Sequence, residues 1–393
     1  MYLASRLAWG TLFSMMGTVY MLYQVEVAHL GPLQLVLVGT ALEVSAFVCE
    51  VPTGILADRY SRKLSVVLGY AITGVAFIVG ALFPVFGMLV LAAIVWGLGW
   101  TFISGAEAAW LADEVGESQA GKLYLKGQRL SSYGSFAGIL VAAALGSWQL
   151  WLPFLLSGVL FVLWSAFCAF GMGEQGFTPQ RHEGKTHVAA MLHITREGMR
   201  TIRGSSTLIL LVVVGIVIGT YSEGYDRLWV AHLLRDFTFP APWGAKPVVV
   251  LGAMSAAMNL TAIAMVSIVE KRVNTDNPAQ IRNTLAWLSA LIMLCTLGFA
   301  LSNHVYLAIL LAVLVNPLRT TTDPLTVSWI NKHVQASSRA TVLSMHSQSD
   351  AFGQMLGGPA VGLVGREYGV RTAISVAALL LVPAVWLYRR ARN

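Results

Sequence analysis

The sequence predicts an all-α integral membrane protein, with twelve transmembrane helices arranged as two six-helix bundles related by pseudo-symmetry. Hydrophobic residues make up 56% of the 393 positions, charged residues make up only 11%, and the mean hydropathy is +0.68. A soluble domain carries about a quarter charged residues, so this chain has too few to cover a surface that faces water. A transmembrane helix needs about 20 mainly apolar residues, and one long polar segment divides the candidate spans into two equal sets.

The predicted spans follow one another with short connections. In chain order they cover residues 7–29, 33–57, 64–83, 86–112, 127–148, 150–171, 207–231, 247–269, 283–301, 304–328, 340–363 and 371–388.

The basic residues predict the orientation of these spans. If both termini are cytoplasmic, most of the 26 Lys and Arg residues fall in cytoplasmic segments, as the positive-inside rule requires. The net charge of +7 then faces the anionic lipid of the inner leaflet and does not indicate nucleic acid binding. We therefore expect a multi-pass protein of the plasma membrane (the bacterial inner membrane) with both termini in the cytoplasm.

The chain divides into an N-terminal bundle at residues 1–172, a cytoplasmic linker at 173–206 and a C-terminal bundle at 207–393. Residues 187–202 of the linker fit an amphipathic helix on the membrane surface, and a flexible linker is the alternative. At one fixed offset between the bundles, Glu43 aligns with Asn259 and Glu107 with Asp323. Repeated halves of this kind are how one class of transporters builds a central site that opens to each side in turn.

A charged loop between the second and third spans interrupts the apolar sequence. It is too short to do more than join two antiparallel helices at one water boundary. Gly54 has no side chain to hold helices apart, and Asp58 can cap the helix that follows. The loop is either an ordinary positive-inside connection or a latch between two groups of helices.

Three motifs carry a resemblance to a known family. The pattern Gly54-x-x-x-Asp58-Arg59-x-Ser61-Arg62-Lys63 resembles the signature loop of the major facilitator superfamily, with Ser61 in place of a glycine. Residues 104–113 are similar to the end of the fourth span in bacterial efflux members. The eleventh span is similar to a motif that antiporters usually carry in the fifth span, and it reads Gly353-x-x-x-Gly357-Gly358-Pro359-x-x-Gly362.

The resemblance implies a transporter of the bacterial efflux (proton antiporter) type that works by alternating access, and not an enzyme. It also implies that Asp58 and Arg59 meet Asp113 and close the cytoplasmic mouth. An arginine between two carboxylates is satisfied on both sides, which agrees with this reading. The predicted gate residues are Gly54, Asp58, Arg59, Arg62, Lys63 and Asp113.

Charges inside the spans are candidates for proton coupling. A charge at the bilayer centre costs at least ~2.5 kcal/mol, so each one needs a partner, water or a proton. Glu43 and Glu50 share a helical stripe, and the alternative for both is a structural contact face. His346 and Asp350 are one helical turn apart and can hand on a proton, or else join a hydrogen-bonded helix contact.

Arg319 is the basic residue placed deepest in a span. We expect Asp323 to neutralise it, with Glu107 as a possible partner from the other bundle, and the pair is either structural or a switch. The candidates for proton coupling are Glu43, Glu50, Glu107, Arg319, Asp323, His346 and Asp350.

Polar and aromatic residues on the spans are candidates for a substrate cavity. Acids mixed with aromatic rings suit a cationic or amphipathic substrate, although aromatic residues are also common in interfacial belts. The candidates are Tyr20, Gln24, Glu26, Trp100, Ser104, Glu223, Asp226, Arg227, Asn259 and Asn316.

No nucleotide-binding loop, nucleophile elbow or zinc motif occurs in the sequence, and the three cysteines are scattered through apolar spans. We therefore expect no cofactor and no metal, and a gradient as the source of energy. The predicted function is that of a monomeric secondary transporter whose partners are a small-molecule substrate, protons and membrane lipid. It would export a small compound, of an amphipathic or drug-like kind among others, in exchange for protons. The alternatives are a proton-coupled uptake symporter for a metabolite and a lipid or lysolipid flippase.

Overall fold

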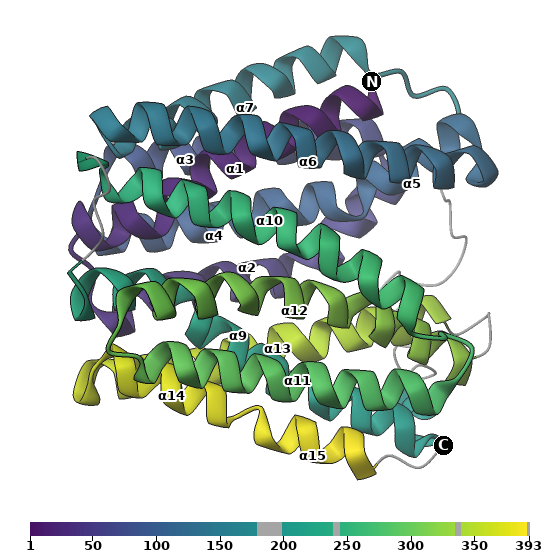
Figure 1. The fold of residues 1–393 in the computed structure, drawn as a ribbon. Coiled ribbons are helices and arrows are strands. Elements are labelled where there is room, and N and C mark those ends of the chain that lie inside the picture. The colour runs from purple at the N-terminus through teal and green to yellow at the C-terminus, as the bar shows by residue number, and fades with distance from the viewer. Residues whose placement is uncertain (179–198, 239–243, 335–338, 391–393) are drawn as a thin grey trace. The chain divides into compact units, whose positions relative to one another are not determined.

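A computed structural model describes residues 1–178, 199–238, 244–334 and 339–390. Within these ranges the chain folds into long helices without strands (Figure 1), which confirms the predicted fold class. The helices are α1 (Tyr2–Glu26), α2 (Pro32–Arg59), α3 (Arg62–Leu82), α4 (Phe86–Ser104), α5 (Ala106–Val115), α6 (Glu117–Trp148), α7 (Trp151–Gly171), α9 (Ser206–Asp236), α10 (Pro247–Arg272), α11 (Pro278–Leu301), α12 (Val305–His333), α13 (Arg339–Tyr368), α14 (Val370–Leu379) and α15 (Val382–Arg390).

Every predicted span falls on one of these helices or on a pair of them, because α4 with α5 and α14 with α15 each make one span. By length and composition alone, 10 helices in the described ranges are apolar enough to cross a membrane. Two long helices, α1 and α13, are more polar and fall outside this set. The predicted surface helix at 187–202 lies mostly outside the described residues.

Local sequence explains several of the helix boundaries. Asn277 caps α11 by accepting hydrogen bonds from the amides of Ala279 and Gln280, and Pro278 occupies the first helical position. Gly116 and Gly369 precede α6 and α14 with φ of 78° and 89°, a conformation that favours glycine. These corners set the short connections between successive spans.

The helices form two compact units. The first contains α1, α3 to α7, the part of α2 after Thr40 and the start of α10 up to Ala253. The second contains α9, α11 to α15, residues 32–40 of α2 and α10 from Met254 onwards. Two helices, α2 and α10, are therefore divided between the units.

Each unit holds a pair of helices whose backbones touch. In the first unit, a Cβ at Gly134 or Gly138 of α6 would collide with a backbone carbonyl of α1. In the second unit, a Cβ at Gly219 of α9 would collide with the carbonyl of Asp350, and a Cβ at Gly353 with that of Ile216. The pairs join the first span to the fifth and the seventh to the eleventh. The same packing thus occurs in both units, as a repeated half predicts.

Candidate transport cavity and cytoplasmic gate

A cavity of about 630 Å³ lies within the second unit, between α9, α11, α12 and α13. Six of the residues predicted for proton coupling or substrate binding line this cavity. Five of them have ionisable side chains, and the sixth has an amide side chain. These six are Asp226, Asn316, Arg319, Asp323, His346 and Asp350. The sequence thus predicted six of the 19 residues that line this cavity, from positions that are far apart in the chain.

The most extensive polar contact in the cavity joins α12 to α9. Arg319 donates Nη1 to Asp226 Oδ1 at 2.5 Å and Nη2 to Asp226 Oδ2 at 2.9 Å. The Tyr221 ring lies 5.7 Å from the Arg319 guanidinium carbon, and its hydroxyl is bonded to Thr296. The guanidinium is thus held by both a carboxylate and an aromatic face.

This contact corrects the prediction for Arg319, which named Asp323 and Glu107 as its partners. A carboxylate on a neighbouring helix can meet the planar fork of the guanidinium with both oxygens, and Asp226 does so. Glu107 instead bonds to Arg6 at 3.2 Å and to the Tyr70 hydroxyl at 3.0 Å.

Three carboxylates and one guanidinium line the described part of the cavity. Asp226 is paired with Arg319, which leaves Asp323 and Asp350 as additional acids. Asp350 Oδ2 accepts a hydrogen bond of 2.7 Å from Gln354 Nε2. The cavity therefore has an excess of acidic groups that a proton or a cation can balance.

His346 lines the same cavity as Asp350, one turn away on α13. The Asp350 carboxylate accepts a hydrogen bond from Gln354, on the following turn. The transfer of a proton between His346 and Asp350 therefore remains a prediction.

Several lining residues were missed by sequence reasoning. Gln354 stands four residues after Asp350, and the 3.6-residue helical period could have identified it. The others are short hydroxylated side chains, which also occur at ordinary helix contacts and give no distinctive pattern. They are Ser222, Ser289, Thr320, Thr322, Thr326 and Ser347.

Two further predicted substrate residues form a buried ion pair in the second unit. Glu223 Oε1 accepts from Arg227 Nε at 3.0 Å, and Glu223 is only 1% exposed. A Cβ at Gly39 of α2 would collide with both of these side chains. Gly358 of α13 also packs on Glu223, so the pair is buried where α2, α9 and α13 meet.

The candidates in the first unit do not gather in one site. The Tyr20 ring packs on Trp96 and Phe154, and Trp100 packs on Trp9 with ring centroids 5.4 Å apart. These rings belong to an aromatic core that side-chain type alone does not distinguish from a binding site.

Other candidates are dispersed along their helices. Gln24 is fully buried on α1, while Glu26 lines a smaller cavity of about 230 Å³ with Lys246. Asn259 is exposed on α10 and donates to the carbonyl of Ser255. Of the other residues, Ser104 ends α4, Glu43 is half-buried, and Glu50 is exposed.

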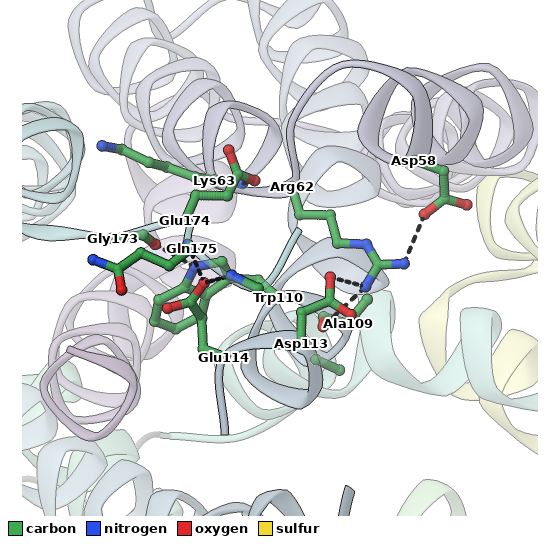
Figure 2. Close-up of polar contacts among 12 residues, drawn as sticks. Asp58, Arg62, Lys63, Ala109, Trp110, Asp113, Glu114, Gly173, Glu174 and Gln175 are labelled. Carbon is green, nitrogen blue, oxygen red and sulfur yellow. Dashed lines mark hydrogen bonds and ion pairs between the residues drawn. The ribbon is translucent and has the colours of Figure 1, made fainter. Parts of the chain in front are cut away.

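The predicted gate is assembled around Arg62 rather than Arg59 (Figure 2). Arg62 Nη1 donates to Asp113 Oδ2 at 2.5 Å and to the Ala109 carbonyl at 3.0 Å, and Nη2 donates to Asp58 Oδ1 at 3.3 Å. Arg59 is exposed at the end of α2, with its guanidinium over the Tyr60 ring. Arg62 begins α3, which places its side chain beside α5. The prediction of an arginine between two carboxylates holds, but the residue named for it was wrong.

Ser61 replaces the glycine of the family pattern and has a clear structural role. Its φ of −176° is extended, so a glycine is not required, and its hydroxyl caps α3 by accepting from Leu64 N at 2.9 Å. The cap predicted at Asp58 is therefore formed by Ser61. Nothing described within its own unit lies within 4 Å of a Cβ built at Gly54, so the close helix approach expected there stays a prediction.

Comparisons with known proteins agree on one family. The family model described as Major Facilitator Superfamily matches residues 1–318. An uncharacterized MFS-type transporter, YxaM of Bacillus subtilis (strain 168), is 25% identical over 362 residues, which are 91% of this chain and 86% of that protein.

Solved structures of transporters share the fold at low sequence identity. The nucleoside transporter NupG superposes with a TM-score of 0.79 at 13% identity, over 100% of this chain and 98% of that one. A bacterial homologue of the human lysosomal transporter Spinster, in an inward-facing and unoccupied conformation, gives 0.76 at 14% identity, over 98% and 96% of the two chains. The POT family transporter PepTSo gives 0.73 at 13% identity, over 99% and 96%.

Proposed function

The chain belongs to the Major Facilitator Superfamily, and from that premise we propose that it is a secondary transporter that exports a small compound in exchange for protons. It works by alternating access, as a monomer in the bacterial inner membrane with both termini in the cytoplasm. The substrate is a cationic or amphipathic molecule. The cavity of the second unit supplies part of its binding site.

The excess of carboxylates in that cavity is the observation that carries this proposal. Asp226 is neutralised by Arg319, whereas Asp323 and Asp350 face the same space without a second guanidinium or ammonium among the described lining residues. Uncompensated carboxylates are costly in a membrane protein, so each one favours a proton or a cationic ligand.

Competition for these acids gives a mechanism for exchange. When a proton occupies Asp350 or Asp323, the cavity loses negative charge and a cationic substrate is released. When the proton leaves to the cytoplasm, the restored carboxylate attracts the next substrate molecule. Because Arg319 neutralises Asp226, the proton and the substrate both meet the negative charge of the remaining carboxylates. Glu43, Glu50 and Glu107 are further candidates for the coupling proton.

The Arg62 cluster supplies the cytoplasmic gate in this proposal. A gate needs contacts that can form and break as the protein changes conformation, and ion pairs at a membrane boundary are suited to this. Asp58, Arg62 and Asp113 provide such contacts between α2, α3 and α5. Gly54, exposed in this conformation, is the position at which helices can come together in the other one.

Transport measured in membranes of known orientation tests the proposal. A thermal-shift screen of drugs, amines, sugars, nucleosides, amino acids and lysolipids first identifies a ligand of the purified protein. Inside-out vesicles with an acidic interior are then placed in a solution that contains the substrate. Export by proton exchange predicts substrate uptake into these vesicles that a protonophore abolishes. Uptake that requires the opposite pH gradient would instead support a proton symporter, and a lysolipid as the sole ligand would support a flippase.

A further inference from the structure

The chain that leaves α7 turns back onto the gate. Residues 173–177 follow the end of α7 at Gly171, and Trp110 Nε1 of α5 donates to the carbonyl of Gly173 at 2.7 Å. A Cβ at Gly176 would collide with the carbonyl of Asp113. This backbone approach requires a glycine, because any side chain would push the segment away from α5. The start of the linker is therefore seated on the gate by its main chain.

Two carboxylates, one from this segment and one from α5, accept the hydrogen bonds that hold the segment against the gate (Figure 2). Glu174 of the linker accepts from Ser61 Oγ at 2.6 Å and from the amide of Lys63 at 2.8 Å. Glu114 of α5 accepts from the amides of Gln175 at 2.6 Å and Gly176 at 2.8 Å. Hydrogen bonds to an ionised carboxylate are stronger than those between neutral groups.

The bonds of Glu174 meet the chain on either side of Arg62. The first amides of a helix have no partner within it and form the positive end of its dipole. Ser61 satisfies one of these amides, that of Leu64, and Glu174 satisfies the amide of Lys63. Because Ser61 and Lys63 flank Arg62, Glu174 fixes the backbone from which the Arg62 guanidinium reaches its two carboxylates. The Phe177 ring also lies 5.8 Å from the Arg62 guanidinium carbon.

We propose that residues 173–177 are part of the gate, and that Glu174 is a positioning residue that holds Arg62 on Asp58 and Asp113. This inference rests on the proposed function, because it assumes that the Arg62 cluster opens and closes during transport. It also explains the serine at position 61, since a glycine there could neither cap α3 nor donate to Glu174. The linker is thereby connected to the gate by a charged side chain and not only by its covalent attachment to α7.

A cysteine reporter separates positioning from simple structural support. Tyr60→Cys places a thiol at an exposed position between α2 and α3, next to Ser61, in a protein whose Cys49, Cys168 and Cys295 are replaced by serine or alanine. The measurement is the rate of labelling by a membrane-impermeant maleimide in inside-out vesicles, together with the thermal stability of each purified variant. The readout does not require a known substrate or a pH gradient.

The variants in this background are Glu174→Ala, the isosteric Glu174→Gln, and Ser61→Gly. Arg62→Ala serves as the reference for a disrupted gate, and Gln175→Ala is the matched control, because Gln175 joins these bonds through its backbone amide. We expect Glu174→Ala to change the labelling rate about fivefold or more, in the same direction as Arg62→Ala. Glu174→Gln, which keeps one acceptor oxygen, should fall between Glu174→Ala and the parent. Ser61→Gly should add little once Glu174 is replaced, since the two share one interaction.

The inference is overturned if Arg62→Ala changes the labelling rate while both Glu174 variants label like the parent. It is also overturned if Gln175→Ala has the same effect as Glu174→Ala, because the segment would then act without the carboxylate. If Glu174→Ala does not fold, Glu174→Gln decides the question by the same comparison. An unchanged rate in Arg62→Ala would overturn the gate itself, and this inference with it, whatever the result of the transport assay.

Discussion

Arg319 of α12 presents both of its terminal nitrogens to the two carboxylate oxygens of Asp226 on α9. This pair stands at the cavity that also contains Asp323 and Asp350. It determines how much of the negative charge in the cavity is already balanced before any ligand enters. Changes to either member should therefore affect both stability and ligand binding.

Asp226→Asn should destabilise the protein by about 1–3 kcal/mol, because Arg319 loses its charged partner in a partly buried site. Arg319→Lys should lose nearly as much, since an ammonium cannot form the bidentate contact. The double variant Asp226→Asn with Arg319→Gln should recover part of the loss. Thermal unfolding, followed by fluorescence-detected size-exclusion chromatography, measures these variants and the single variant Arg319→Gln, and additive losses in the double variant would show that the two residues do not interact.

Asp350→Asn should abolish transport driven by a pH gradient, whereas counterflow exchange should persist at a higher substrate concentration. An amide cannot take up or release the coupling proton, and the cavity loses one of the carboxylates that attract a cation but keeps Asp323. Asp323→Asn and Glu43→Gln, measured beside it in reconstituted vesicles, identify which acid carries the proton. If all three variants retain gradient-driven transport, proton coupling through these acids is wrong.

Arg62→Ala should reduce the transport rate by about tenfold or more, and Arg59→Ala should have a much smaller effect. Arg62 bridges Asp58 and Asp113, whereas Arg59 lies exposed on the Tyr60 ring. Initial rates at saturating substrate make this comparison, with the amount of protein in the membrane as the control. A larger effect at Arg59 would restore the assignment suggested by family resemblance.

Alanine at Gly219 or Gly353 should prevent correct packing of α9 on α13. The added methyl group meets a backbone carbonyl that no rotamer change can move, and overpacking of this kind costs about 1–3 kcal/mol or more. Gly17→Ala on α1, where nothing described lies within 4 Å of the new Cβ, is the matched control. Yield of monodisperse protein and thermal stability should fall in the first two variants and stay at the parental level in the third.

His232 should be a stabilising residue near the end of α9. It is fully buried, and its Nδ1 and Nε2 face the Asp236 carboxylate at 2.5 Å and the Phe299 carbonyl at 3.2 Å. His232→Phe removes both of these polar contacts and should cost about 1–3 kcal/mol in unfolding free energy. A double-mutant cycle with Asp236→Asn separates this bond from the loss of packing, and a coupling energy near zero would rule the bond out as a stabilising contact.

The fold could be predicted from sequence because lipid leaves a chain few options. A backbone in hydrocarbon must satisfy its own hydrogen bonds, so apolar runs of sufficient length become helices, and the spans follow from their lengths. Six of the polar residues that line the second-unit cavity could be found for a related reason, since charged and strongly polar side chains are rare and costly within a membrane.

The partners of those charges could not be predicted in the same way. Arg319 bonds to Asp226 rather than to Asp323, and Asp113 bonds to Arg62 rather than to Arg59. Helical periodicity shows which residues share a face, but not which face of another helix lies opposite. Which side chains pair depends on how each helix is rotated about its own axis. The glycines that set this rotation do so through contacts between helices, which the sequence does not specify.

The glycine contacts between α9 and α13 have a mechanical consequence. Their backbones meet without an intervening layer of side chains that could absorb tilt or sliding. Asp226 and Asp350 therefore belong to one closely packed pair of helices, α9 and α13, while Arg319 and Asp323 belong to α12. We therefore expect a change of charge in the cavity to displace α12 relative to α9 and α13, because the Arg319–Asp226 contact between α12 and α9 is made by polar side chains.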